Sequence, residues 1–304
     1  MTALPHDRIG IVVPDVGPAS TTAQVIERMV ATSAQRLIAS DPVVRLGVDP
    51  EGVHQARVAT RRLRSDLRLV RSMVGPGWLD DLRGNLRWLG GVLGAVRDLD
   101  VLHERFVEHA AMFPLDAQAD VRRVLDRVQA TREPARTALL SAMQGSRYER
   151  LLEALREAAS DPRVRDHVAH ERAARAMGPL MRAPWAHLVK VCDGLDPASP
   201  DAALHEARIR SKRVRYAAEA LAPVFGGPAR RFARRAEALQ GVLGSHQDAV
   251  VALAWLRTCA GAESDLAFGA GMLGGVEAAI RDDARRRWPR RWRALRRRAP
   301  RFWE

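Results

Sequence analysis

Two stretches of the sequence place a histidine and a row of basic residues at the spacing of an α-helix. The first, residues 53–70, repeats a basic residue every three or four positions, so these side chains share one face of a helix. Arginine presents a planar fork of N–H donors that matches phosphate oxygens in pairs. The row therefore predicts a surface for a phosphate-rich anion, and its members are His54, Arg57, Arg61, Arg64 and Arg68.

The second row lies in residues 204–221, at an offset of 151 residues from the first. Its members are His205, Arg208, Lys212 and Arg215. Glu219 stands at the position that corresponds to Arg68, so the second row is shorter and we expect it to be partly neutralised by its own carboxylate. The two histidines either extend the positive row when they are protonated or are held by a neighbouring helix, and the sequence leaves both roles open.

The opposite face of each stretch is apolar, which predicts that both helices pack one side against a core. On the basic face, like charges three or four residues apart cost about 0.2–0.5 kcal/mol per pair. The first row has no carboxylate on that face to compensate. It extends over about 21 Å along the helix axis, which is longer than a single phosphate group needs. An external chain of phosphate groups fits this surface best.

A second motif also occurs twice, at an offset of 150 residues. Each copy has two glycines three positions apart, an aspartate four positions further on, and an arginine earlier on the same stripe of the helix. Because glycine costs about 1 kcal/mol inside a helix, the motif predicts a close helix crossing, with the aspartate placed to pair with an arginine of a basic row. The crossing residues are Gly91, Gly94 and Asp98, then Gly241, Gly244 and Asp248; Arg87 and Arg234 are candidate secondary basic contacts.

Helical periodicity and turn signals organise the chain, and the alternating pattern of strands is missing from the sequence. We therefore predict an all-α protein. The repeated motifs predict two similar halves that join near Asp161 and Pro162. Residues 21–160 are expected to form the first helical bundle, and residues 161–304 the second, which includes an arginine-rich final helix. Residues 1–20, with three prolines, are expected to form an extended leader outside the folded unit.

The formal net charge of +13 and the isoelectric point of about 11.2 indicate a polyanionic partner. No stretch has the roughly 18 consecutive apolar residues that a membrane span needs, and a signal-peptide pattern is missing, so we expect a cytoplasmic protein that does not bind a membrane. Residues 281–304 carry eleven arginines. Trp288, Trp292 and Leu295 would dock this segment, and its basic face either meets solvent or contributes to the anion site.

Together these motifs resemble the CHAD family, the conserved histidine α-helical domains, over about residues 21–304. The resemblance is carried by the two His-x-x-Arg-x-x-x-Arg/Lys helices, by the run from Arg215 to Glu219, and by the twin Gly-x-x-Gly-x-x-x-Asp segments. It implies two four-helix bundles related by pseudo-twofold symmetry, with a basic channel between them that binds inorganic polyphosphate, and in some members association with polyphosphate granules. The positions that match the family's basic residues are His54, Arg57, Arg61 and Arg64, with His205, Arg208, Lys212 and Arg215.

Some CHAD chains also carry a CYTH triphosphatase domain, whose Glu-x-Glu-x-Lys pattern is absent here. We therefore expect a stand-alone binding module that is not an enzyme and uses neither a metal nor a cofactor. One alternative is non-specific nucleic-acid binding, which the charge permits although sequence-reading motifs are missing. The other is a metal-dependent phosphohydrolase, but acids are scarce on the basic faces and such catalysis needs a metal cluster. Its candidate residues are His54, His205, Asp98 and Asp248. The sequence leaves the oligomeric state open.

Overall fold

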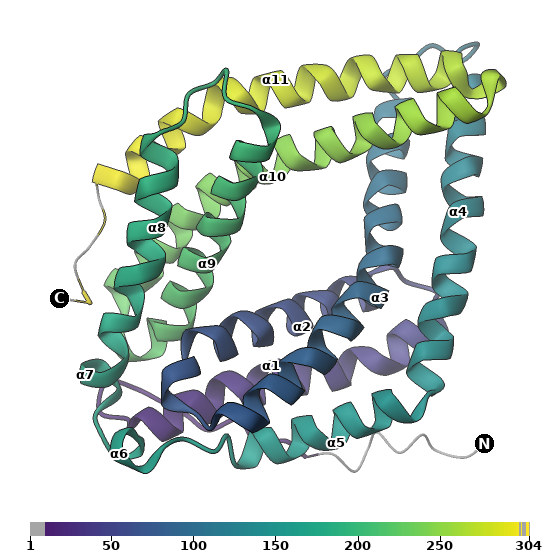
Figure 1. Ribbon diagram of the computed structural model, residues 1–304. Coiled ribbons are helices and arrows are strands. Elements are labelled where there is room, and N and C mark those ends of the chain that lie inside the picture. The colour runs from purple at the N-terminus through teal and green to yellow at the C-terminus, as the bar shows by residue number, and fades with distance from the viewer. Residues whose placement is uncertain (1–9, 298, 300–301, 304) are drawn as a thin grey trace.

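The computed structural model describes residues 10–297, 299, 302 and 303. Within these residues the regular structure is helical, with two isolated β-bridges, so the predicted all-α class is confirmed. Figure 1 shows the helices arranged as a four-sided frame. The main helices are α1 (Thr22–Leu46), α2 (Glu51–Leu69), α3 (Pro76–Ala110), α4 (Gln118–Gln144), α5 (Ser146–Ser160), α8 (Arg182–Asp193), α9 (Asp201–Phe225), α10 (Gly227–Ala262) and α11 (Ala267–Arg297).

The duplication predicted from the motifs extends to the helix boundaries. α2 and α9 begin 150 residues apart, α3 and α10 begin 151 apart, and α4 and α11 begin 149 apart. Pro50 and Pro200 immediately precede α2 and α9, and α3 and α10 each have a proline in the first turn. Proline is favoured there because the first N–H groups of a helix have no partner within the helix. The same local signals therefore start corresponding helices in both halves.

One large core joins the two halves at the end of the frame where α2 and α9 cross. Each of the main helices around it contributes buried side chains from one face, which is compatible with the two predicted bundles. Representative residues of the first half are Ile26, Leu63, Leu86 and Leu155, and of the second half Leu188, Val214, Phe232 and Trp288. Because all of them belong to one cluster, the basic faces of α2 and α9 are fixed relative to each other by the packing behind them.

A second, smaller core closes the frame at the tips of the long helices. Phe106 of α3 and Val124 of α4 pack there with Leu256 of α10. α11 approaches α4 so closely that a Cβ added at Gly269 would lie 2.7 Å from the carbonyl carbon of Asp120. Figure 1 shows this contact where the α3–α4 and α10–α11 hairpins meet. The two halves are therefore in contact at the hairpin tips as well as at the α2–α9 crossing.

The predicted boundary at residue 161 does not separate the halves. Arg165 N donates to Met73 O (2.9 Å), and Ala173 N donates to Ser20 O (3.0 Å). The short helices α6 (Asp166–Ala169) and α7 (Ala173–Met177) pack against α1. The first half is therefore completed by residues that the repeat assigned to the second.

The predicted leader is partly built into the fold. Residues 10–20 are non-helical, but Ile11, Val13 and Val16 pack against the main core, and Arg28 of α1 donates to Pro14 O (2.7 Å). The expectation that this part lies outside the folded unit is wrong, because its apolar side chains find a surface on the core. Residues 1–9 lie outside the described residues.

Candidate anion-binding site

Basic residues from the two halves converge where α2 and α9 cross. Lys212 of α9 lies at the centre of this convergence. Burial lowers the pKa of its ammonium group to about 7, because the charged form loses contact with water. Arg208, Arg61 and Arg57 also lower it, and Asp248 opposes them. Four basic side chains from both predicted rows therefore share one site, in which they outnumber the carboxylates.

The first row continues this cationic surface beyond the crossing. Burial lowers the pKa of Arg64, and the neighbouring Arg87, Arg68 and Arg83 lower it further. The predicted secondary contact Arg87 therefore belongs to the same surface, with Arg83 one turn before it on α3. Arg234 of α10 is exposed, and it is not among the charges that lower the pKa of Arg64, Arg68, Arg208 or Lys212.

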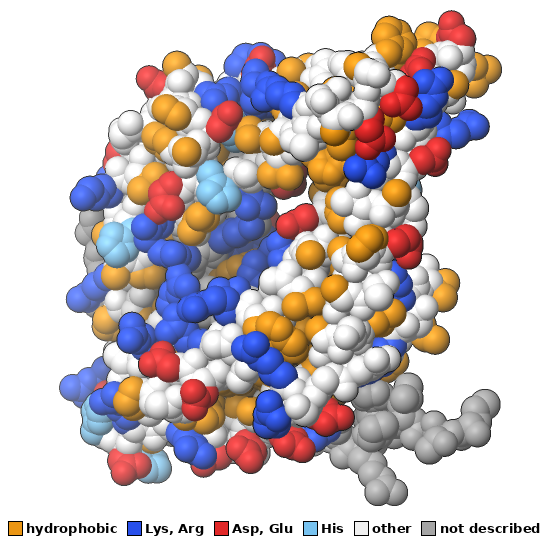
Figure 2. Space-filling view, turned by 45° about the vertical axis from the view of Figure 1, so that its right-hand side comes forward, with side chains coloured by type: hydrophobic (Ala, Val, Ile, Leu, Met, Phe, Trp, Pro, Cys, Tyr) orange, Lys and Arg blue, Asp and Glu red, His pale blue; other side chains and the backbone are white. Residues whose placement is uncertain are grey.

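A cavity of about 240 Å³ opens between α2 and α9 within this surface. Arg213 of α9 contributes to it, and its pKa is lowered by burial and by Arg68 and Arg210. Figure 2 shows Lys and Arg side chains gathered along a hollow in one face of the molecule. The residues that line the cavity are Arg61, Arg64, Ser65, Arg68, Ile209, Lys212, Arg213 and Tyr216.

The glycine and aspartate motif of the first half holds an arginine of the row. Arg57 Nη2 lies 3.1 Å from Asp98 Oδ1, and Arg57 Nη1 donates to Gly90 O (3.2 Å). A Cβ added at Gly94 would lie 2.7 Å from Arg57 Nη1, so this glycine makes room for the guanidinium. An added Cβ at Gly91 would meet nothing within 4 Å. The predicted pairing of the aspartate with a row arginine is confirmed.

The second copy of the motif has the same arrangement. Arg208 Nη2 lies 3.7 Å from Asp248 Oδ1, and a Cβ added at Gly244 would lie 3.8 Å from Arg208 Nε. Nothing lies within 4 Å of a Cβ added at Gly241. The predicted helix crossing at Gly91 and Gly241 is therefore wrong. The close approach at Gly94 and Gly244 is made by an arginine side chain that reaches across to the aspartate.

Arg215, the last member of the second row, is paired with acids. Its Nε donates to Glu219 Oε1 (2.6 Å), and its Nη2 lies 2.8 Å from Glu237 Oε1. Burial acts to lower the pKa of Arg215, but these two carboxylates raise it above the ordinary value. Glu219 also accepts a hydrogen bond from Arg62 of α2. The predicted self-neutralisation of the second row is confirmed, and Arg215 is not free to hold an external anion while these pairs last.

The two histidines have different surroundings. His205 Nδ1 lies 2.6 Å from Gln247 Oε1 of α10, so His205 is held by a neighbouring helix. His54 is half-buried and lines, with Arg61 and Arg62, a cavity of about 440 Å³ between α1, α2 and α9. Of the two roles that the sequence leaves open, the structure assigns helix contact to His205 and places His54 among cations.

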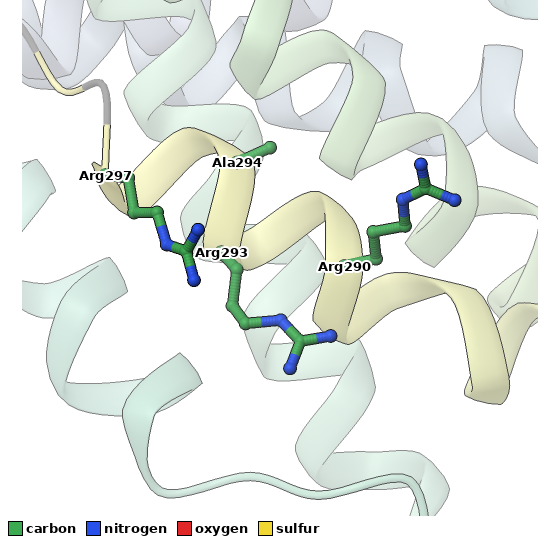
Figure 3. Close-up of a pocket in the computed structure, with 4 residues that line it drawn as sticks. All are labelled: Arg290, Arg293, Ala294 and Arg297. Atoms are coloured by element: carbon green, nitrogen blue, oxygen red, sulfur yellow. The ribbon is translucent and has the colours of Figure 1, made fainter.

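The arginine-rich end of α11 is docked through its apolar edge, as expected. Trp288, Trp292 and Leu295 are buried, and Trp292 Nε1 donates to Asp193 Oδ1 (2.9 Å). The arginines of the other face are exposed and line a surface cavity of about 510 Å³ (Figure 3). They are Arg290, Arg293 and Arg297. None of them is among the charges that lower the pKa of Arg64, Arg68, Arg208 or Lys212.

Between residues 10 and 297, and at 299, 302 and 303, no group of three or more His, Cys, Asp or Glu side chains is placed to hold a metal ion. The four residues of the phosphohydrolase alternative therefore do not assemble into a metal site. Asp98 and Asp248 are instead engaged by arginines. Among the helices of the described chain, none combines the length and apolar character needed to cross a membrane.

The family can now be assigned. The CHAD domain model matches residues 28–257. This chain belongs to the CHAD family. Two Mycobacterium tuberculosis proteins, the uncharacterized proteins MT2285 of strain CDC 1551 / Oshkosh and Rv2226 of strain ATCC 25618 / H37Rv, are each 31% identical to it over 242 residues. Each match covers 75% of this CHAD chain and 44% of the relative, so the chain spans less than half the length of these relatives.

Two solved structures share the fold of this CHAD protein. The crystal structure of the CHAD domain from the plant Ricinus communis has a TM-score of 0.71 and 26% identity, and the match covers 88% of this chain and 89% of that chain. PptA from Streptomyces chartreusis has a TM-score of 0.73 and 20% identity, and the match covers 90% of this chain and 100% of that chain. The second likeness supports the fold alone.

Sequence reasoning missed four arginines of the cationic surface of this CHAD chain. Arg62 and Arg213 each follow a row residue directly, so they lie about 100° away from the row on their helices. They join the surface because α2 and α9 cross and each helix brings a second face toward the other. Including a wider face of each helix, and the four-residue spacing between Arg83 and Arg87, would have predicted some of these residues. The four missed arginines are Arg62, Arg83, Arg210 and Arg213.

Proposed function

We propose that this CHAD chain binds inorganic polyphosphate, without catalysis, in the cationic groove where α2 and α9 cross. The observation that carries the proposal is the convergence of four basic side chains from the two rows on one site with two nearby carboxylates, those of Asp98 and Asp248. Half-buried like charges are unfavourable, and an external anion relieves them. In the described residues, Arg61 Nε and Arg208 Nε are also buried donors without an acceptor.

The extent of the surface favours a polymer over a single phosphate group. The first row covers about 21 Å of α2, and α3 adds Arg83 and Arg87 beside Arg64. One phosphate group reaches only a few of these guanidinium groups, whereas a chain of phosphates reaches successive ones. Arginine forks hold phosphate oxygens without a base or a sugar.

The surroundings of Tyr216 favour polyphosphate over nucleic acid. Single-stranded nucleic acids gain affinity when bases stack on exposed aromatic rings. The ring of Tyr216 is the aromatic group of the cavity, and it is buried, with the guanidinium groups of Arg61, Arg62 and Arg215 at 5.8, 5.5 and 5.8 Å from its centroid. The ring therefore offers no free face to a base. Binding of polyphosphate would also bring the protein to polyphosphate granules.

Calorimetric titration with polyphosphates of graded length, at several salt concentrations, tests the proposal. We expect the affinity to rise with chain length until the groove is filled, and to fall steeply with salt because bound phosphates release counterions, by analogy with nucleic acids. Duplex DNA at equal phosphate concentration should compete poorly. Polyphosphate incubated with the protein and magnesium or manganese should keep its length. An affinity that does not depend on chain length, or a shortened chain, would overturn the proposal.

A further inference from the structure

The carboxylate of Glu219 lies between two guanidinium groups from different halves. Its Oε2 accepts a hydrogen bond from Arg62 of α2, and its Oε1 accepts one from Arg215 Nε of α9 (2.6 Å). Guanidinium groups hold phosphate oxygens by the same kind of charge-assisted hydrogen bond. All three side chains are 23% exposed, so solvent reaches them. Glu219 is therefore the anionic partner between these two guanidinium groups.

A cationic cavity adjoins this carboxylate. Its volume is about 440 Å³, and Arg36 of α1 and His54 of α2 line it together with Arg61, Arg62 and Arg215. Glu219 is the one acid among its lining residues. Arg36, Arg62 and Glu219 also line a neighbouring cavity of about 200 Å³. One carboxylate among four guanidinium groups leaves the cavity with an excess of positive charge.

The duplication does not repeat a carboxylate at this position of the helix. The corresponding residue of the first half is Arg68, which is exposed at the end of α2. Both partners of Glu219 also have a second acid: Arg62 Nε lies 3.5 Å from Asp66 Oδ2, and Arg215 pairs with Glu237. Burial raises the pKa of Asp66 to about 7, so its carboxyl group is a weaker partner than Glu237 at neutral pH. The departure of Glu219 would therefore leave each arginine with one acidic residue beside it.

We propose that this cavity binds one phosphate group of a polyphosphate chain, and that Glu219 is an internal competitor that holds Arg62 and Arg215 until phosphate displaces it. The proposal rests on the proposed function, since it adds a subsite for the same ligand. A terminal phosphate group of the chain has more acceptor oxygens and more negative charge than a carboxylate, so it satisfies Arg62 and Arg215 and also reaches Arg36. Displacement of Glu219 then frees the last member of the second row for the polymer.

The first test replaces Glu219 by glutamine, which keeps the shape of the side chain and removes its charge. Glu219→Gln should bind tripolyphosphate about three- to tenfold more tightly, which corresponds to the removal of one charged competitor. The matched control is Glu104→Gln, which changes the net charge equally and breaks the Arg97–Glu104 pair (2.8 Å) on α3. Unchanged or weaker binding by Glu219→Gln, or an equal gain in Glu104→Gln, would overturn the proposal.

The second test uses Arg36→Gln, because Arg36 is exposed and belongs to neither basic row. We expect it to weaken tripolyphosphate binding severalfold and to leave the urea unfolding curve unchanged. An Arg36→Gln variant that binds tripolyphosphate as tightly as the wild type would contradict the subsite. An equal gain for orthophosphate and tripolyphosphate in Glu219→Gln would overturn the assignment to a polymer. If both variants bind like the wild type while long polyphosphate still binds, the subsite fails and the proposed function stands. If wild-type protein binds no polyphosphate, both fail.

Discussion

Arg57 of α2 and Asp98 of α3 form an ion pair of 3.1 Å, and Arg208 and Asp248 repeat it at 3.7 Å in the second half. The carboxylates are 64% and 39% exposed, so the pairs contribute little to the free energy of unfolding. The charges of both arginines lower the pKa of Lys212, so both guanidinium groups lie near the crossing of α2 and α9. The duplicated pair therefore fixes the direction of one guanidinium in each half.

Gly94→Ala tests whether the glycine of the motif positions Arg57. The added Cβ would lie 2.7 Å from Arg57 Nη1, so the guanidinium must leave its place beside Asp98. We expect polyphosphate affinity to fall about fivefold, the equivalent of one hydrogen bond. Gly241→Ala is the control, because its Cβ meets nothing: it should raise the free energy of unfolding by about 0.5–1 kcal/mol and leave binding unchanged. Equal binding by both variants would refute the positioning role.

Lys212 should make stability depend on pH. Its pKa is lowered from 10.5 to about 7 in the folded protein, so between these values the unfolded chain binds more protons than the folded one. The free energy of unfolding therefore gains a contribution that rises with pH from about 7 to 10.5. Lys212→Met should lose this contribution, as measured by urea unfolding across the range. A variant that keeps the wild-type pH profile would contradict the burial of Lys212 beside Arg208 and Arg61.

The same residue should couple polyphosphate binding to proton uptake. A bound anion favours the charged form of Lys212 and raises its pKa, so the complex should take up about one proton at pH 8 and the affinity should weaken as pH rises above 7. Calorimetry in two buffers of different ionisation enthalpy measures this uptake. Lys212→Arg keeps the charge at all these pH values, and we expect it to bind without the uptake. Uptake that persists in this variant would assign the proton to another group.

Gly269→Ala tests the contact that closes the frame at the hairpin tips. The added Cβ would meet the backbone of Asp120 on α4, which cannot move as a side chain can. We expect a loss of about 1–3 kcal/mol in the free energy of unfolding, typical of an overpacked core. Gly271→Ala, on the same helix with nothing near its Cβ, should instead be slightly stabilising. Two variants of equal stability would argue against close packing of α11 on α4.

The local features of this protein could be predicted from its sequence because they depend on residues that lie a few positions apart in the chain. The apolar and basic faces of α2 and α9 follow from helical periodicity. The pairing of Arg57 with Asp98 follows from two motifs that recur with nearly the same offset. The neutralisation of Arg215 by Glu219 follows from their separation of one helical turn.

The long-range features could not be predicted in the same way. Which faces of α2 and α9 meet depends on how two distant segments pack, so the pairing of Arg62 with Glu219 has no local signal. The contact between Gly269 and α4 likewise depends on where two long hairpins end. The glycines were expected to face a helix, yet Gly94 faces an arginine, because spacing alone does not tell a backbone from a long side chain.

The most direct test of the central claim compares two double charge reversals that lower the net charge equally. The first variant reverses two charges where the two rows converge, Arg61→Glu/Lys212→Glu. The second reverses two exposed charges at the end of α11, Arg290→Glu/Arg293→Glu. Long-chain polyphosphate is titrated into each variant after urea unfolding shows that it is folded. We expect the first to lose at least about 100-fold in affinity, since each charged contact contributes about 1.5 kcal/mol or more, and the second to stay within about threefold of the wild type. Equal losses, or an unchanged affinity in the first variant, would contradict a polyphosphate site at the α2–α9 crossing.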